Sequence, residues 1–121
     1  MRKRVLRVVV LVLTISVSVT TGHREALRIN PNDALAHSNL GFTFQRQDKL
    51  DDARVELREA IRINPNLAEP HYLLGGALRQ QGNRTGSARE FREFLRLATG
   101  SPKWKANIER ARSILPELEK H

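Results

Sequence analysis

Residues 25–32 of the chain read EALRINPN, and residues 59–66 read EAIRINPN. The two octapeptides differ at one position, and they begin 34 residues apart. A weaker third copy, EFLRLATG, follows at the same interval over residues 93–100. A fixed period of this length is typical of proteins in which short structural units stack and bury their apolar faces against one another. The sequence therefore predicts a repeat array.

Apolar and small residues recur at helical spacing within each repeat. In the first complete repeat they predict helices over residues 33–46 and 50–63, and in the second a helix after residue 66 and another over residues 84–98. Pro31 and Pro65 separate the units, because proline lacks a backbone donor and disfavours helix in the residue before it. We expect Asn32 and Asn66 to cap the helices that follow.

The chain ends in an amphipathic segment that begins with a serine and a proline, a common helix start. We expect this helix to cap the open end of the array and Pro116 to end or kink it near Leu115. The predicted organisation is a leader over residues 1–22, a repeat region over 23–100 (partial unit 23–33, complete units 34–67 and 68–101), and a capping helix and tail over 102–121.

The repeated positions resemble the tetratricopeptide repeat (TPR) family, whose units carry a Leu-Gly pair, an aromatic residue, small residues at the helix crossing and a closing proline. The matching residues are Leu40, Gly41, Phe44, Ala53, Leu57, Ala60 and Pro65 in the first unit, and Leu74, Gly75, Ser87 and Phe91 in the second. Thr99 stands where the second unit would have its proline. The resemblance implies an all-α fold in which antiparallel helix–turn–helix repeats stack as a short right-handed α-solenoid with a C-terminal capping helix.

In this family the first helix of each unit lines a concave surface, so the resemblance implies a groove for a protein or peptide partner. The candidate groove residues are Leu35, Ser38, Asn39, Phe42, Gln45 and Arg46 in the first unit, and Glu69, Tyr72, Leu73, Gly76, Arg79 and Gln80 in the second. We expect Phe42, Tyr72 and Leu73 to anchor a ligand, and Arg46 and Arg79 to meet an acidic group.

Two alternatives to a groove-binding scaffold stay open. Phe42, Tyr72 and Leu73 are equally suited to an assembly surface through which the chain associates with itself. The repeats also fit a fragment or accessory region of a larger protein, such as a repeat-containing glycosyltransferase.

The residue pattern argues against an enzyme and against a cofactor or metal site. The sequence contains no cysteine, no phosphate-binding glycine loop and no nucleophile elbow. His37 and His71 occupy equivalent positions, which suggests a metal pair, but no third ligand accompanies them in phase. We expect both to be packed, partly buried rings.

The net charge is +8, and its distribution separates the leader from the rest. Residues 1–22 hold four basic residues, no acid and an uncharged apolar run, the layout of an export signal. We expect a chain that is exported or anchored by this leader, its only membrane contact, or a cytoplasmic chain if the reading frame begins inside a longer gene. In residues 23–121 acids and bases mix along the helices, which argues against nucleic-acid binding.

Overall fold

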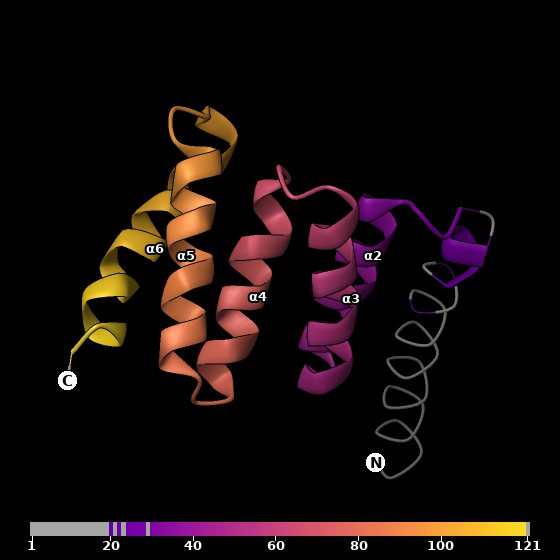
Figure 1. The fold of residues 1–121 in the computed structure, drawn as a ribbon, viewed down its shortest axis with the longest axis horizontal. Coiled ribbons are helices and arrows are strands. Elements are labelled where there is room, and N and C mark those ends of the chain that lie inside the picture. The colour runs from indigo at the N-terminus through magenta and orange to yellow at the C-terminus, as the bar shows by residue number, and fades with distance from the viewer. Residues whose placement is uncertain (1–19, 21, 23, 29, 121) are drawn as a thin grey trace, which may run out of the picture.

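The computed structural model describes residues 20, 22, 24–28 and 30–120, and within them it is helical, with no strand. After a helical segment over residues 24–28, the elements are α2 (Ala34–Arg46), α3 (Leu50–Ile63), α4 (Ala68–Gln80), α5 (Arg84–Ala98), the short 3₁₀ helix η1 (Pro102–Trp104) and α6 (Lys105–Leu118). In Figure 1 the helices α3 to α6 lie next to one another in chain order, and α2 lies behind α3. The predicted all-α class and the short solenoid are confirmed.

Helices α2 and α3 form one hairpin and α4 and α5 a second, while α3 packs on α4 and α6 packs on α5. Each hairpin depends on a glycine in its first helix. A β-carbon at Gly41 would lie 2.6 Å from Cγ of Leu57, and one at Gly75 would lie 3.1 Å from the ring of Phe91. Both partner side chains are almost completely buried, so the two glycines set how closely each pair of helices can approach.

The buried apolar side chains form two clusters. One joins α2, α3 and α4 and includes Leu40, Phe44 and Leu57; the other joins α5 and α6 and includes Phe94. Tyr72 of α4 packs against both clusters. The solenoid therefore has a core that continues from one repeat into the next.

The exposed side of the first hairpin is partly covered by the segment before it. Leu27 packs against the α2–α4 cluster, and the Arg24 guanidinium lies over the Phe44 ring, 5.8 Å from its centroid. The predicted leader lies outside the described residues apart from Thr20 and Gly22. Within the described part of the chain, no helix has the length and hydrophobicity needed to cross a bilayer.

Both predicted asparagine caps were wrong. Asp33, not Asn32, caps α2, because its Oδ1 accepts a hydrogen bond from the backbone N–H of Ala36 (3.1 Å). Asn66 does not cap α4: the N-cap residue is Leu67, which makes no side-chain cap bond. In each Asn-Pro-Asn turn, the asparagine before the proline forms the side-chain hydrogen bond and stabilises the turn. Oδ1 of Asn64 accepts from the Asn66 N–H at 3.1 Å, and the earlier turn has the same bond.

Pro116 does not end α6, since the helix continues to Leu118. The alternative that it kinks the helix stays a prediction. Leu118 is buried against the α5–α6 cluster. The Arg84 guanidinium donates hydrogen bonds to the backbone carbonyls of Glu117 and Lys120. These contacts stabilise the last turn although proline supplies no backbone donor to it.

Candidate functional site

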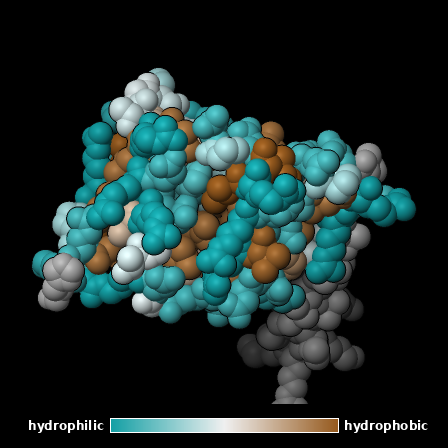
Figure 2. All heavy atoms as spheres, viewed as in Figure 1, coloured by the Kyte–Doolittle hydropathy of each residue, from teal (hydrophilic) through white to brown (hydrophobic). Residues whose placement is uncertain are grey.

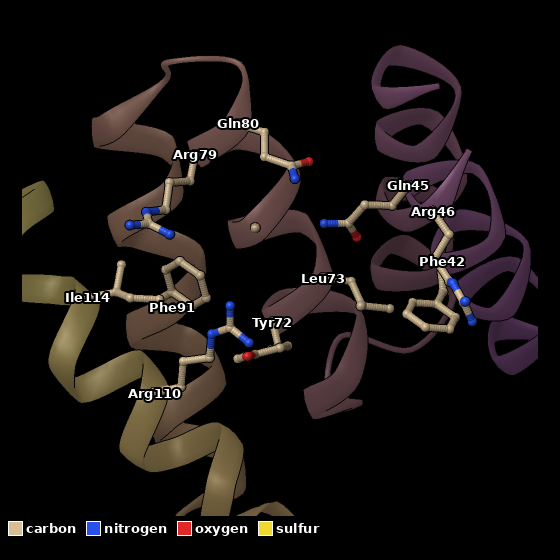
Figure 3. Close-up of a pocket in the computed structure, with 11 residues that line it drawn as sticks. Phe42, Gln45, Arg46, Tyr72, Leu73, Arg79, Gln80, Phe91, Arg110 and Ile114 are labelled. Carbon is tan, nitrogen blue, oxygen red and sulfur yellow. The ribbon is translucent and has the colours of Figure 1, made fainter. Parts of the chain in front are cut away.

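A groove of about 390 Å³ lies across the first helices of the repeats. Helix α2 contributes Phe42, Gln45 and Arg46 to its lining. Helix α4 contributes Tyr72, Leu73, Gly76, Arg79 and Gln80. Phe91 of α5 and Arg110 and Ile114 of α6 complete it, as Figure 3 shows.

The depth of the groove follows from one position of the repeat. Phe42, Gly76 and Arg110 are 34 residues apart in turn, on α2, α4 and α6. The outer two positions carry large side chains, and the middle one carries none. A β-carbon at Gly76 would meet only the amide nitrogen of Gln45, at 3.0 Å. Gly76 therefore keeps a hollow open between two large side chains.

The wall of the groove is aromatic and aliphatic. The ring of Tyr72 packs edge-on against Phe91, with centroids 5.7 Å apart, and tilts against Phe94 at 5.0 Å. Leu73 is 8% exposed and Phe42 is 42% exposed. The Tyr72 and Leu73 side chains are thus fixed by the core, whereas Phe42 presents much of its ring to solvent.

Four of the sequence-predicted groove residues lie outside the lining. Leu35 and Asn39 are exposed on α2, and Glu69 is half-buried at the start of α4. Ser38 corrects the prediction: it is fully buried, and its hydroxyl has no hydrogen-bond partner among the described residues. The equivalent residue, Tyr72, reaches the groove because its side chain is long, whereas the short serine side chain ends inside the packed helices.

The sequence prediction also missed three lining residues. Arg110 and Ile114 belong to the helix that was expected only to cap the array, and Phe91 comes from the second helix of its repeat. The repeat register itself held the missing signal. Arg110 follows Gly76 by one period and Ile114 follows Gln80 by one period, so α6 occupies the place of a first helix.

Away from the groove, His37 and His71 each make two hydrogen bonds inside their repeat. His71 Nδ1 lies 2.7 Å from Oε2 of Glu90, and Nε2 lies 3.1 Å from the carbonyl oxygen of Pro65. His37 repeats this with Glu56 at 2.7 Å and the Pro31 carbonyl at 2.8 Å. Carboxylate and carbonyl oxygens only accept hydrogen bonds, so these contacts favour the doubly protonated imidazole, in which both ring nitrogens donate.

These contacts decide the direction in which the histidine pKa values shift. Burial alone would lower the pKa of His71, but the hydrogen bonds to Glu90 and to the Pro65 carbonyl raise it. The negative charge of Glu90 raises it further, and the net shift is upward from the usual histidine value. The pKa of His37 is raised in the same way: burial opposes the shift, and the hydrogen bonds to Glu56 and to the Pro31 carbonyl, together with the negative charges of Glu56 and Glu59, outweigh it.

Both histidines therefore have a structural role within their own repeat. Each ties the first helix to a glutamate of the second helix and to the proline turn that precedes the unit. Among the residues that the structure describes, no group of three His, Cys, Asp or Glu side chains could hold a metal ion.

Comparisons with known proteins agree with this geometry. Two family models match: a tetratricopeptide repeat model over residues 24–55 and a TPR repeat model over residues 46–82. No curated protein sequence matches the chain significantly.

Solved structures share the fold at low sequence identity. The Yersinia enterocolitica type III secretion chaperone SycD, in complex with a peptide of the translocator YopD, is 14% identical with a TM-score of 0.82, over 88% of this chain and 81% of that one. PcrH, in complex with the chaperone binding region of PopD, is 15% identical with a TM-score of 0.79, over 98% and 92%. A Thermobaculum terrenum O-GlcNAc transferase mutant is 23% identical with a TM-score of 0.72, over 85% of this chain and 18% of that one. The chain thus carries tetratricopeptide repeats over residues 24–82.

Proposed function

We propose that this protein is a non-catalytic scaffold that binds an extended or helical segment of a partner protein in the groove formed by α2, α4 and α6. The observation that carries the proposal is the hollow at Gly76, flanked by the equivalent side chains Phe42 and Arg110. A preformed concave site with an apolar wall and a few polar groups is the usual form of a binding site. Two of the similar structures, SycD and PcrH, are complexes with segments of other proteins, which supports the same use of the fold here.

A substitution that fills the hollow at Gly76 tests this proposal. Gly76→Leu places a side chain in the hollow, and its β-carbon meets only the flexible end of Gln45. The matched control is Arg58→Leu on the exposed face of α3. Peptides selected on the full chain from a displayed random library are expected to lose binding to Gly76→Leu and to retain it with Arg58→Leu. Selected peptides that bind both variants equally would refute a groove at this place.

Self-association is a second candidate function, and it rests on the exposed apolar residues of the first complete repeat. Leu35 is 56% exposed, and Phe42 lies on the same helix two turns further on. Light scattering at rising protein concentration would detect an oligomer, and Leu35→Glu is expected to dissociate it if α2 forms the contact. A monomer at all concentrations would exclude this candidate.

Two further proposals concern the whole protein. The O-GlcNAc transferase comparison, in which the match spans 18% of that chain, supports the alternative that these repeats serve as the accessory region of a larger protein.

The second of these proposals is export of the protein by the leader over residues 1–22. The mass of the mature protein tests it, since a soluble chain that retains residues 1–18 would contradict export.

A further inference from the structure

The groove carries an unbalanced charge. Three arginines line it, Arg46 from α2, Arg79 from α4 and Arg110 from α6, and the described residues of the lining include no aspartate or glutamate. Arginine guanidinium groups donate hydrogen bonds in a planar fork that matches a carboxylate. The groove lining therefore carries positively charged hydrogen-bond donors and, among its described residues, no carboxylate to neutralise them.

The second helices of the repeats differ from the groove in this respect. Arg62 of α3 pairs with Glu59, one turn earlier in the same helix. Arg96 of α5 pairs with Glu93 in the same way. These two arginines are thus neutralised within their own helices, whereas no carboxylate of the described residues lies within hydrogen-bond distance of the groove arginines.

The three groove arginines retain donors for a ligand. The Arg46 guanidinium lies over the Phe42 ring, 5.7 Å from its centroid, which leaves its hydrogen-bond donors at the edge. Arg79 lies 3.9 Å from Glu117, too far for a hydrogen bond, and both side chains are exposed. Arg110 forms no ion pair with any carboxylate in the described part of the chain.

A polar group in the groove wall points to the backbone of a ligand. The Gln45 side chain extends from α2 toward α4 (Figure 3), and its Oε1 is buried without a hydrogen-bond partner among the described residues. A buried acceptor left without a donor costs free energy. The amide nitrogen of Gln45 faces Gly76, and rotation of this amide would bring Oε1 into the hollow, where it can accept a hydrogen bond from a peptide N–H.

The arginines are spread rather than convergent. Arg46 lies at the α2 side of the groove, whereas Arg79 and Arg110 lie at the α6 side, with Tyr72 and Leu73 between them (Figure 3). Resting on the proposed function, we infer that the groove selects an acidic peptide segment in which carboxylate side chains flank an apolar residue. The apolar residue occupies the hollow over Gly76, and the carboxylates meet Arg46 on one side and Arg79 with Arg110 on the other.

A peptide fits this groove better than a nucleic acid, which would also present negative charge. Binding of single strands relies on aromatic faces on which bases stack. Here the Arg46 guanidinium lies over one face of the Phe42 ring, and the Tyr72 ring packs against Phe91 and Phe94. The rings thus serve contacts within the protein.

Fluorescence anisotropy with labelled peptides tests the inference on the full chain. Three peptides share the same apolar residues and carry either Asp and Glu, Asn and Gln, or Lys at the flanking positions. We expect the acidic peptide to bind about ten-fold more tightly than the amide peptide at low salt, and this preference to shrink as salt screens the charges. The double variant Arg79→Gln/Arg110→Gln should lose most of the preference.

The matched control is Arg58→Gln/Arg89→Gln, which removes the same charge from exposed positions on α3 and α5 and should keep the preference. Equal binding of acidic and amide peptides, blocked by Gly76→Leu, would overturn the acid selectivity while leaving groove binding intact. If no peptide binds in a way that Gly76→Leu blocks, both proposals fall. A single-stranded oligonucleotide that binds more tightly than the acidic peptide and loses affinity in the groove double variant would overturn the inference in favour of nucleic acid.

Discussion

The Nδ1 atom of His71 lies 2.7 Å from Oε2 of Glu90, and the same pair recurs as His37 and Glu56 one repeat earlier. The His71 side chain is 7% exposed and the His37 side chain 13% exposed. Nε2 of each ring is also hydrogen-bonded to the carbonyl oxygen of the proline that precedes its unit. A protonated histidine thus holds three segments of each complete repeat together.

These pairs predict that the protein loses stability as pH rises above neutrality. The pKa values of His37 and His71 are raised in the folded protein, so the protonated rings stabilise it fully below the unfolded value of about 6.5. That contribution disappears as pH rises through the folded pKa values. Urea unfolding of the full chain, measured from about pH 6 to about pH 9, should show a falling free energy of unfolding.

The double variant Glu56→Gln/Glu90→Gln is the control for this pH dependence. It removes the two carboxylates that hydrogen-bond to the histidines and raise their pKa values, and it leaves the rings and the more distant charges of Glu59 and Glu93 in place. Its free energy of unfolding should therefore vary less over the same pH range. A wild-type slope equal to that of the variant would show that other groups cause it.

The two pairs should differ in strength because their burial differs. At pH 6, Glu90→Gln is expected to cost about 1.5–3 kcal/mol, the usual range for a hydrogen bond to a charged group. Glu56→Gln should cost less, since both side chains of its pair are more exposed than those of His71 and Glu90. Urea unfolding of the two single variants measures the order, and a larger cost for Glu56→Gln would contradict it.

Three glycines in first helices should respond differently to alanine. Gly41→Ala forces a β-carbon against the fully buried Leu57 and is expected to destabilise the protein by about 1–3 kcal/mol. Gly76→Ala meets only the end of Gln45 and should stabilise by about 0.5–1 kcal/mol, the usual gain for glycine to alanine in a helix. Gly75→Ala should fall between them, because the Phe91 ring must shift by a few tenths of an ångström.

Thermal melting of the three alanine variants gives this order directly. Gly41→Leu extends the same clash and is expected to abolish cooperative unfolding. An unchanged melting temperature in Gly41→Leu would refute the packing role of this position.

The sequence predicted the fold well because each repeat encodes its own helices. Helices α3 and α5 begin and end at the predicted residues 50–63 and 84–98, since turns and helical stripes act over short distances and occur twice in register. The caps were harder to predict. Asp33 rather than its neighbour Asn32 takes the extended backbone from which a side chain reaches Ala36, a detail of the turn and not of residue preference.

The groove was predicted less completely, for two physical reasons. Side-chain length decides whether an inward position reaches the surface, so Ser38 is buried where Tyr72 lines the groove. The helix that closes an array also continues its inner surface, so Arg110 lines the groove although α6 lacks the repeat's Leu-Gly pair. Neither effect is visible in the spacing of apolar residues alone.

The last prediction contrasts two fully buried serines. The Ser87 hydroxyl donates to the carbonyl oxygen of Gly75 at 2.7 Å, whereas the Ser38 hydroxyl has no partner in the described part of the chain. Ser87→Ala leaves a buried carbonyl without this donor and is expected to cost about 1–3 kcal/mol. Ser38→Ala removes a hydroxyl that lost its water on folding and gained no partner, so its effect should be neutral or stabilising. Urea unfolding of the two variants makes the comparison, with nearly the same atoms removed in each. Equal losses would mean that the cavity, and not the hydrogen bond, dominates at both sites.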